Sequence, residues 1–518
     1  MVVCGRRIRR PCREVERRKP AMNDRGKSDG LVVPVNLPNN AGRPAAEGGE
    51  GRGLAKGNPP EGNALRTQSR DSAHSTLERI HEAARRDRKQ RFTALLHHVY
   101  DIGRLRSAYF ALKRNAAAGV DGERWRGYGK DLEGNLEDLA DRIKRGAYRA
   151  KPVRRAYIPK ADGRQRPLGI PTLEDKIVQR AAVEVMSAIY EQDFLGFSYG
   201  FRPRRSPHQA LDAVAVGIGT RKVKWVLDAD IRGFFDTLDH AWLVKFVEHR
   251  VGDQRIVRLI QKWLAAGVLE DGKRTPSEVG TIQGGSISPL LANIYLHYVF
   301  DLWVQRWRTK QAHGDVIVVR FADDFVAGFE HRQDAERFLA ELRERFAKFG
   351  LELHPDKTRL IEFGRYAEQN RRDRGDGKPG TFNFLGFTHV CAKTQKGHFT
   401  VLRQTMRTHW QAKLKEVKAT LRRRIHATVA ELGQYLRSVV GGHVRYYGVP
   451  LNSRSVWAFR FSIGRIWKWV LERRSQRTRV PWERMSRLIA RWLPPARICH
   501  PYPLVRFGVN TQGGSRMR

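Results

Sequence analysis

The sequence predicts an α+β fold in which helices cover one face of an antiparallel sheet. VIVVRFADDFVAGF (residues 316–329) has two apolar, strand-like runs separated by two aspartates, so it predicts a hairpin. DAERFLAELRERFAKFG (334–350) has apolar residues at helical spacing and ends in a glycine, which is a helix stop signal. LELHPDKTRLIEF (351–363) returns to strand character, and KWVLDADIRGFFD (224–236) carries another strand run into an acidic end. This order of strand, hairpin, helix and strand is typical of an α+β layer.

Size and charge limit the class of function. The chain has 518 residues, of which 41% are hydrophobic, so it can bury a sizeable core. Its formal net charge is +43, from 97 Lys and Arg against 54 Asp and Glu. A surface this basic attracts polyanions, and nucleic acid is the partner that the charge favours. A membrane-surface role competes on charge, but the sequence has no run of about 18 apolar residues and no signal peptide, so no membrane partner is expected.

Residues 1–75 are expected to form a disordered, basic leader, because residues 20–75 are rich in Gly, Pro and Asn and show no periodicity. Met1 and Met22 both fit a translation start. Helical spacing begins at Thr76, where ordered structure is expected to start. The cysteines are too scattered for a disulfide framework or a metal quartet, and they are interpreted as reduced thiols: Cys4, Cys12, Cys391 and Cys499.

Asp323 and Asp324 stand at the turn of the predicted hairpin. An isolated pair of aspartates is most often a solvated turn. Here the apolar flanks place the hairpin on a core, which would hold its tip rigidly, and Asp230 ends another strand run. If the sheet brings the three carboxylates together, their repulsion calls for a cation. Mg²⁺ suits such a site, because it takes carboxylate oxygens together with water and substrate phosphates, and two ions about 4 Å apart serve phosphoryl transfer.

Eight sequence blocks, in order from about residue 90 to residue 395, resemble the motif series of reverse transcriptases. AAAGVDG, IPKADGRQRPLGIPTLEDKIVQ and FSYGFRPRRSPHQAL resemble the fingers blocks of the group II intron branch, and DIRGFFD, QGGSISPLLANIYL, FADD, HPDKT and FNFLGF resemble the motifs that follow. The resemblance implies a right-hand polymerase with fingers, a palm that contains the antiparallel sheet and the FADD hairpin, and then an α-helical thumb/maturase domain. The implied divisions are a leader (1–75), fingers and palm (76–395), a thumb/maturase-specific domain (396–495) and a short basic tail (496–518).

The resemblance also implies how the acidic residues act. Asp230 and Asp323 are similar to the two metal-ligating carboxylates of the family, and Asp324 is similar to a third acid that is often bound less directly. Ile231 would supply its backbone carbonyl as a further ligand. The implied cofactor is Mg²⁺, with two ions per active site and Mn²⁺ as a substitute. The three aspartates are the implied catalytic residues for attack of a primer 3′-hydroxyl on a dNTP.

Five further residues resemble dNTP-binding residues of the family. Phe235 is similar to the aromatic residue under the incoming sugar, whose ring would clash with a 2′-hydroxyl; taken alone it is typical of a core aromatic. Lys160 and Arg166 resemble fingers cations that hold the triphosphate, although both patterns also fit solvated surface charges. Gln283 begins a glycine loop that approaches the nucleotide in the family and otherwise fits an ordinary turn. Lys357 matches a lysine proposed to protonate the leaving pyrophosphate.

The C-terminal part of the chain is strongly basic. Residues 401–518 hold 25 Lys and Arg against 4 Asp and Glu, a net charge of +21, and six of the 12 tryptophans. Basic residues interleaved with aromatics suit phosphate contact and stacking on unpaired bases, but the aromatics also fit the core of a helical domain. This part resembles the maturase-specific domain, which grips intron RNA. The residues expected to bind RNA are Arg445, Tyr446, Tyr447, Arg465, Lys468, Arg473 and Arg474.

The resemblance implies an RNA-directed DNA polymerase and intron maturase. Such a protein binds its group II intron RNA, assists splicing and copies the RNA into cDNA from a DNA primer at the target during retrohoming. It is expected in the cytoplasm as a nucleoid-associated ribonucleoprotein. Relatives with an HNH nuclease carry paired cysteines, and Cys499-His500 lacks such partners, so no endonuclease is expected. Dimers occur in the family, and the sequence leaves a homodimer open.

Three alternatives stay open at this point. A reverse transcriptase of another lineage, serving defence or diversity generation, would keep the palm but lack the maturase-like segment. A splicing cofactor with an inactive polymerase would have lost one of the acids, whereas all three are present. An RNA-dependent RNA polymerase is disfavoured by Phe235. Nothing in the sequence identifies the intron, the DNA target or the source of a second-strand primer.

Overall fold

The computed structural model describes residues 76–159, 165–270, 273–275, 280, 284–475 and 479–506. The predicted leader lies outside these residues. Residues 76–86 are helical, as the spacing after Thr76 predicts. Short helices follow: α2 (Leu96–Val99), α3 (Ile102–Ala111), α4 (Trp125–Tyr128), the 3₁₀ turn η1 (Gly129–Asp131) and α5 (Leu132–Lys144).

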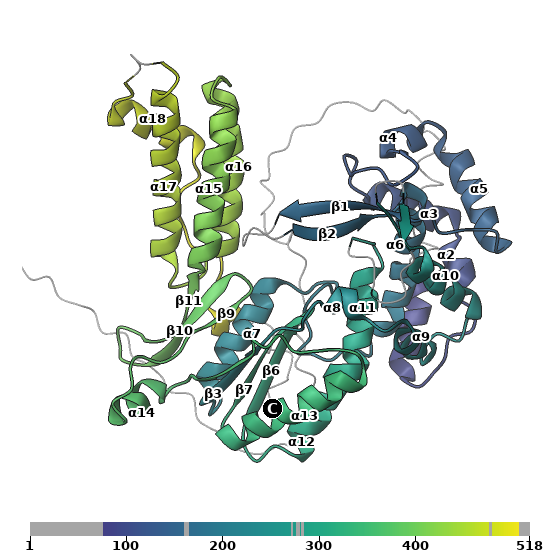
Figure 1. Ribbon diagram of the computed structural model, residues 1–518, viewed down its shortest axis with the longest axis horizontal. Helices are drawn as coiled ribbons and strands as arrows, with labels where there is room; N and C mark the ends of the chain where they lie inside the picture. The colour runs from purple at the N-terminus through teal and green to yellow at the C-terminus, as the bar shows by residue number, and fades with distance from the viewer. Residues whose placement is uncertain are drawn as a thin grey trace, which may run out of the picture.

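A four-stranded sheet, here called the outer sheet, has the strand order β2-β1-β4-β5. β1 and β2 form an antiparallel ribbon, and β1 runs parallel to β4. Figure 1 shows this ribbon extending from the N-terminal helices toward the C-terminal helices. The strands are β1 (Val153–Pro159), β2 (Gln165–Ile170), β4 (Val268–Glu270) and β5 (Lys273–Thr275), and the helices of this part are α6 (Leu173–Tyr190), α9 (His240–Glu248) and α10 (Gln254–Ala265).

A second four-stranded sheet, the central sheet, has the order β6-β7-β3-β8, and every neighbouring pair is antiparallel. Its strands are β3 (Trp225–Ala229), β6 (Val316–Phe321), β7 (Asp324–Phe329) and β8 (Arg359–Glu362). The helices of this part are α7 (Pro207–Thr220), α8 (Phe234–Thr237), α11 (Ser288–Leu296), the π-helix η2 (His297–Asp301), α12 (Leu302–Lys310) and α13 (Arg332–Lys348).

The predicted helix over 334–350 is confirmed by α13, which buries Ala335, Phe338, Leu342 and Phe346. The strand predicted over 351–363 is correct only for β8, because HPDKT (354–358) turns the chain before the strand begins. A proline and two charged residues within that motif do not suit a strand interior.

Both faces of the central sheet are covered, whereas the sequence predicts helices on one face. Residues such as Leu227 and Phe325 belong to a large core shared with α11, α12 and α13. Val226, Val319 and Val326 on the other face belong to a second core shared with α7 and a three-stranded sheet. The strands are apolar on both sides, and a sheet of this kind has to be buried on both faces.

The three-stranded sheet has the order β11-β10-β9 and is entirely antiparallel. The predicted domain boundary at residue 396 falls in the loop between β10 and β11. β11 pairs with β10 along its full length, so the strands on either side of this boundary belong to one sheet. The elements here are α14 (Ala367–Asp373), β9 (Phe382–Phe384), β10 (Phe387–Lys393) and β11 (Phe399–Thr405).

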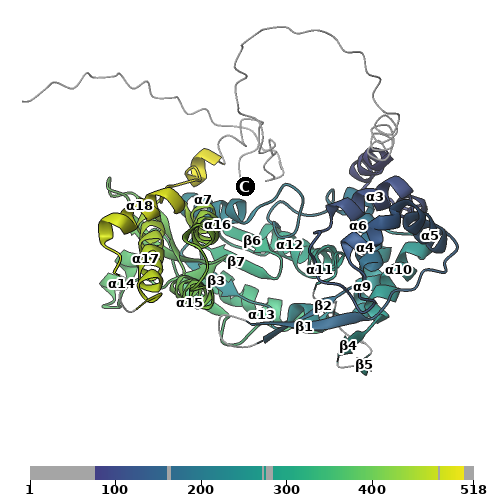
Figure 2. The ribbon, with the colours of Figure 1, turned by 90° about the horizontal axis from the view of Figure 1, so that it is seen from above.

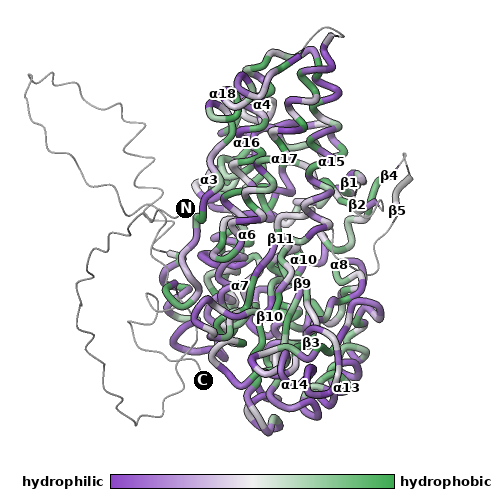
Figure 3. Tube along the Cα trace, turned by 90° about the vertical axis from the view of Figure 1, so that its left-hand side faces the viewer, coloured by the Kyte–Doolittle hydropathy of each residue, from purple (hydrophilic) through white to green (hydrophobic). Residues whose placement is uncertain are grey.

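The C-terminal helices form a bundle with its own core. Thr428 and Glu431 make a capping box that begins α16, and Figure 3 shows hydrophobic and hydrophilic residues alternating along α15, α16 and α17. This bundle is named the helical domain. Its helices are α15 (Arg407–Arg423), α16 (Val429–Tyr447), α17 (Ser453–Glu472) and α18 (Trp482–Trp492).

Figures 1 and 2 show the helical domain standing at one end of the molecule and the outer sheet with its helices at the other, with the central sheet between and below them. In both views α17 and α18 lie on the side of the domain away from the β1–β2 ribbon. Within the described residues, no helix is both long enough and apolar enough to span a membrane.

Candidate active site and nucleic-acid surface

The three predicted acids meet at one end of the central sheet. β3 and β7 pair so that Ala229 lies opposite Phe325. The same register, continued by one residue, sets Asp230 opposite Asp324. Ala322 and Asp323 form the two-residue turn between β6 and β7. The adjacent strand therefore brings Asp230 to the hairpin that carries the other two acids.

The carboxylates at this end of the sheet repel one another. The Asp324 side chain reaches solvent, but surrounding protein atoms withdraw its carboxyl group from bulk water. This desolvation, together with repulsion from Asp323 and Asp230, raises the pKa of Asp324 to about 7. Burial likewise raises the pKa of Asp228, which lies on β3 beside the same group. A cation bound here would relieve this repulsion.

Lys357 supplies a positive charge next to these acids. Its ammonium group contacts the Asp230 carboxylate and opposes the rise in the pKa of Asp324. The turn that carries the lysine is attached to the end of β3, because the His354 amide donates to the Asp230 carbonyl at 2.8 Å. HPDKT therefore brings a cation to the carboxylates from a segment that is distant in sequence.

Ile231 is buried and forms an isolated antiparallel bridge with Leu353. The two hydrogen bonds of the bridge run from the Arg232 amide to the Glu352 carbonyl and from the His354 amide to the Asp230 carbonyl, both at 2.8 Å. The bridge therefore does not use the Ile231 carbonyl, which suits its predicted role as an oxygen ligand.

The donor set at this end of the sheet fits Mg²⁺. Within the described ranges, no cluster of three or more His, Cys, Asp or Glu side chains is arranged to hold an ion unaided. Mg²⁺ does not require such a cluster, because it is usually bound by one or two carboxylates, with water and substrate phosphates completing its shell. The adjacent, mutually repelling carboxylates supply oxygen donors of the kind that Mg²⁺ takes.

Phe235 lies on the short helix α8, five residues after Asp230, and its side chain is 9% exposed. Its ring packs edge-to-face on Phe234 at 5.4 Å between centroids. Of the other predicted dNTP-binding residues, Lys160 and Gln283 lie outside the described residues. Arg166 is described through its backbone, which pairs with Ile158 in the β1–β2 ribbon.

The predicted RNA-binding residues fall into two groups. Tyr446 and Tyr447 are half-buried where the helical domain meets the three-stranded sheet; both rings pack on Phe387, and the Tyr446 hydroxyl donates to the Leu385 carbonyl at 2.9 Å. These contacts give the two tyrosines a packing role. The basic residues lie on the helical domain, where Lys468 is paired with Glu472.

Two aromatic features of the helical domain are missed when the sequence is interpreted alone. Trp457 and Phe461 on α17 are 58% and 45% exposed and stack with their ring centroids 5.2 Å apart. Arg473, the residue that follows α17, lies 4.2 Å from the centre of the Trp469 ring on that helix. Two cations of α15 also lie over that ring, Lys418 at 4.7 Å and Arg422 at 5.3 Å. The i, i+4 spacing of Trp457 and Phe461 is the only sequence signal for the exposed pair, and core aromatics share that spacing.

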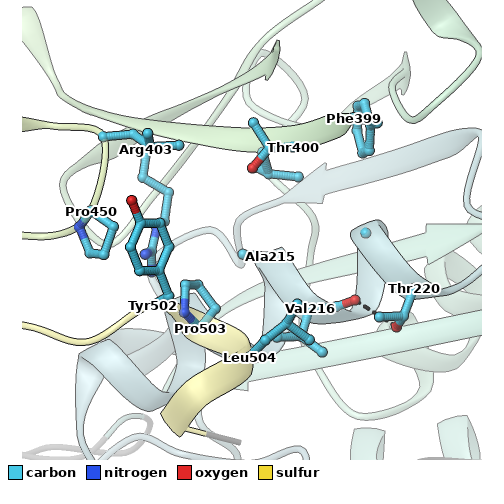
Figure 4. A pocket seen from close by; sticks show the side chains of 13 residues that line it. Ala215, Val216, Thr220, Phe399, Thr400, Arg403, Pro450, Tyr502, Pro503 and Leu504 are labelled. Atoms are coloured by element: carbon cyan, nitrogen blue, oxygen red, sulfur yellow. Dashed lines mark hydrogen bonds between the residues drawn. The ribbon is translucent and has the colours of Figure 1, made fainter. Parts of the chain in front are cut away.

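A cavity of about 170 Å³ lies elsewhere, between α7, β11 and residues 502–504 (Figure 4). None of the predicted catalytic residues lines it. Arg403 on its wall pairs with the buried Asp212 at 2.6 Å, and Arg506 approaches the same carboxylate at 3.1 Å. These contacts join the C-terminal segment to α7, so part of the predicted basic tail is packed against the protein. Cys391 and Cys499 are free thiols, whereas Cys4 and Cys12 lie outside the described residues.

Part of the chain is similar to known proteins. Residues 158–389 match the family model described as reverse transcriptase (RNA-dependent DNA polymerase). The group II intron-encoded protein LtrA of Lactococcus lactis subsp. cremoris is 37% identical over 45% of this chain and 39% of its own length. Protein YkfC of Escherichia coli (strain K12) is 39% identical over 40% of this chain and 62% of its own length.

An uncharacterized 91 kDa protein in the cob intron of Schizosaccharomyces pombe is 38% identical over 35% of this chain and 22% of its own length. The chain thus spans less than two thirds of the length of the relatives it matches. The matched segment contains all three acids at the end of the central sheet. Residues 158–389 are thus similar to the reverse transcriptase family, and the chain is similar to group II intron-encoded proteins over part of its length.

Proposed function

We propose that this chain is an RNA-directed DNA polymerase that also binds group II intron RNA, assists its splicing and copies it into cDNA during retrohoming. The observation that best supports the polymerase is the register of β3 and β7, which sets Asp230 opposite Asp324 inside the segment that matches the reverse transcriptase family. In this proposal the central sheet is the palm, the outer sheet belongs to the fingers and the helical domain is the thumb.

The proposed roles follow from the chemistry of each group. Asp230, Asp323 and the Ile231 carbonyl would hold two Mg²⁺ ions, with Asp324 beside them. When bound, such a pair of ions activates the attacking primer 3′-hydroxyl and stabilises the leaving oxygen. Lys357 would donate a proton to the departing pyrophosphate, and its contact with the Asp230 carboxylate supports that role.

Primer extension tests the polymerase directly. The purified chain is given a DNA primer on an RNA template with dNTPs and Mg²⁺, and extension is followed on a denaturing gel. We expect extension that EDTA stops and that added Mg²⁺ restores. A chain that binds group II intron RNA tightly but extends no primer under these conditions would contradict the polymerase and support a splicing cofactor with an inactive palm.

Phe235 is proposed to select deoxyribonucleotides. Phe235→Val should open space for a 2′-hydroxyl and reduce discrimination against rNTPs by about tenfold or more, a range typical of steric selection in a pocket. The measurement is the ratio of kcat/KM for a dNTP to that for the matching rNTP. Phe234→Val is the control, because this neighbouring ring packs against Tyr295. It should lower stability without altering the ratio, and an equal change in both variants would contradict the proposed role.

The helical domain is proposed to bind intron RNA on the exposed face of α17. Trp457 and Phe461 expose their stacked rings there, with the exposed Arg454 and Arg465 on the same helix. Exposed aromatics between arginines suit unpaired bases, which stack on the rings while the cations contact phosphates. α17 lies on the side of the helical domain away from the β1–β2 ribbon (Figure 2).

Trp457→Ala should weaken binding of intron RNA by about tenfold, since one base–aromatic stack contributes about 1–3 kcal/mol. The measurement is the Kd for intron RNA by filter binding at fixed salt, together with primer extension on a short unstructured template, which should not change. Tyr366→Ala is the matched control, because Tyr366 is 54% exposed beside α14, outside the helical domain. Equal losses of affinity in the two variants would argue against a specific stacking surface on α17.

A further inference from the structure

A fully buried ion pair lies directly behind the turn that carries Asp323. Arg320 and Asp301 are both 0% exposed, and the Arg320 guanidinium donates to the two Asp301 carboxylate oxygens at 2.7 and 2.6 Å. Its remaining nitrogen, Nη1, donates to the Asn293 side-chain oxygen at 3.0 Å and to the Ala322 carbonyl at 2.9 Å. One guanidinium therefore links a helix of the core to the backbone of the turn.

The turn itself has a strained backbone. Ala322 has φ +58°, in the left-handed region that disfavours residues with a Cβ. Two-residue hairpin turns need such a conformation and usually place Asn, Asp or Gly there. The strained conformation at Ala322 is thus maintained by its surroundings.

The backbone of Gly200 lies against the same turn. A Cβ added to Gly200 would lie 2.2 Å from the Ala322 amide nitrogen, so no other residue fits at that position without moving the turn. The Gly200 carbonyl accepts from the Asn293 side-chain amide at 2.7 Å. Asn293 thus holds both the loop that approaches the turn and the arginine that bonds to it.

The π-helix η2 explains why Asn293 and Asp301 can act together. Asp301 follows Asn293 by eight residues. In a regular α-helix with 3.6 residues per turn, this spacing would rotate the second side chain about 80° around the helix axis from the first. A π-helical segment has more residues per turn, so η2 rotates Asp301 back toward the face that carries Asn293. Both side chains then reach Arg320.

We infer that Arg320, Asp301, Asn293 and Gly200 are positioning residues that hold the Ala322–Asp323 turn, and with it the adjacent acids, in the reactive geometry; this inference rests on the proposed polymerase function. A buried ion pair is a poor source of stability, because desolvation offsets most of its attraction. A guanidinium fork nevertheless fixes direction, and catalytic groups have to be held to within a fraction of an ångström. The four residues form one clamp, defined by their contacts with one another and with Ala322.

Gly200→Ala tests the clamp with a single methyl group. We expect kcat for primer extension to fall about 10- to 100-fold per folded molecule, because a displacement of about 1 Å at a reacting group has effects of that size. The Kd for primer–template should stay within about twofold. Gly219→Ala is the matched control: this glycine lies on α7, a Cβ there meets nothing within 4 Å, and kcat should not change.

Asp301→Asn keeps the size of the side chain but removes the charge that orients Arg320, so it tests the clamp even if Gly200→Ala does not fold. Its control is Asp193→Asn, which alters another buried arginine pair, Asp193 with Arg250 at 2.9 Å. The clamp predicts that Asp301→Asn lowers kcat at least tenfold more than Asp193→Asn at equal loss of Tm. If wild type extends primers, and Asp301→Asn and Asp193→Asn lose activity only in proportion to their loss of folded protein, the clamp is overturned but the proposed polymerase function is not. If wild type extends no primer, the proposed function itself fails.

Discussion

Asp323→Ala is expected to abolish cDNA synthesis while leaving RNA binding nearly intact. Asp323 occupies the β6–β7 turn, beside the two acids at the ends of β3 and β7. Loss of a metal-ligating carboxylate removes several kcal/mol of transition-state stabilisation, and each 1.36 kcal/mol is tenfold in rate, so the loss should be about 1,000-fold or more. The measurement is single-turnover primer extension alongside the Kd for intron RNA.

Asp315→Ala is the control for this variant, because Asp315 lies just before β6 at the opposite end of the same hairpin and pairs with Arg221. It should retain polymerase activity within a few-fold. A folded Asp323→Ala protein that loses both RNA binding and primer extension would contradict the proposed separation of a catalytic palm from an RNA-binding helical domain. Full extension by Asp323→Ala would remove this residue from the catalytic set.

Lys357→Met is expected to slow the chemical step by about 100-fold with little change in KM for the dNTP. The variant removes the ammonium group that contacts Asp230 and that we propose as the proton donor to pyrophosphate. General acid catalysis contributes about 10²- to 10⁴-fold, and the expected effect lies at the lower end of this range. The measurement is the single-turnover rate at saturating dNTP, with Lys357→Arg tested for partial recovery.

Arg359→Met supplies a closely matched control. Arg359 is 51% exposed and pairs with Asp228, whereas Lys357 is 52% exposed and pairs with Asp230. Removing Arg359 breaks a similar ion pair two residues farther along the same segment, but one that involves no proposed metal ligand. Equal slowing by the two substitutions would mean that the loss of a local ion pair, and not a proton donor, explains the effect of Lys357→Met.

Local sequence patterns identify much of the candidate site. Apolar runs on either side of Asp323 and Asp324 predict two strands, and β6 and β7 lie there. The spacing of Ala335, Phe338 and Leu342 predicts a helix, and α13 confirms it. These predictions succeed because strand and helix periodicities are properties of a few neighbouring residues.

Other features depend on contacts between distant segments. Tyr446 and Tyr447 are expected to bind RNA from the resemblance to the maturase-specific domain, and that expectation stays a prediction. The packing of their rings on Phe387 depends on a contact between segments far apart in the sequence. Arg320 interrupts an apolar strand, and a charged residue at such a position signals a buried partner. That signal does not identify the partner, because Asp301 reaches it only through the π-helix.

The sequence by itself determined the mixed class of helices and antiparallel strands, the motif order and the three candidate acids, because each is encoded by residue types at short spacing. Only the tertiary structure decided which strand lies beside the hairpin, and so which carboxylates meet. It also decided that Lys357 contacts Asp230 and that Arg320 and Gly200 hold the Ala322 turn. The physical reason is that strand order, close backbone approach and burial of a charge depend on long-range packing, which optimises all contacts together.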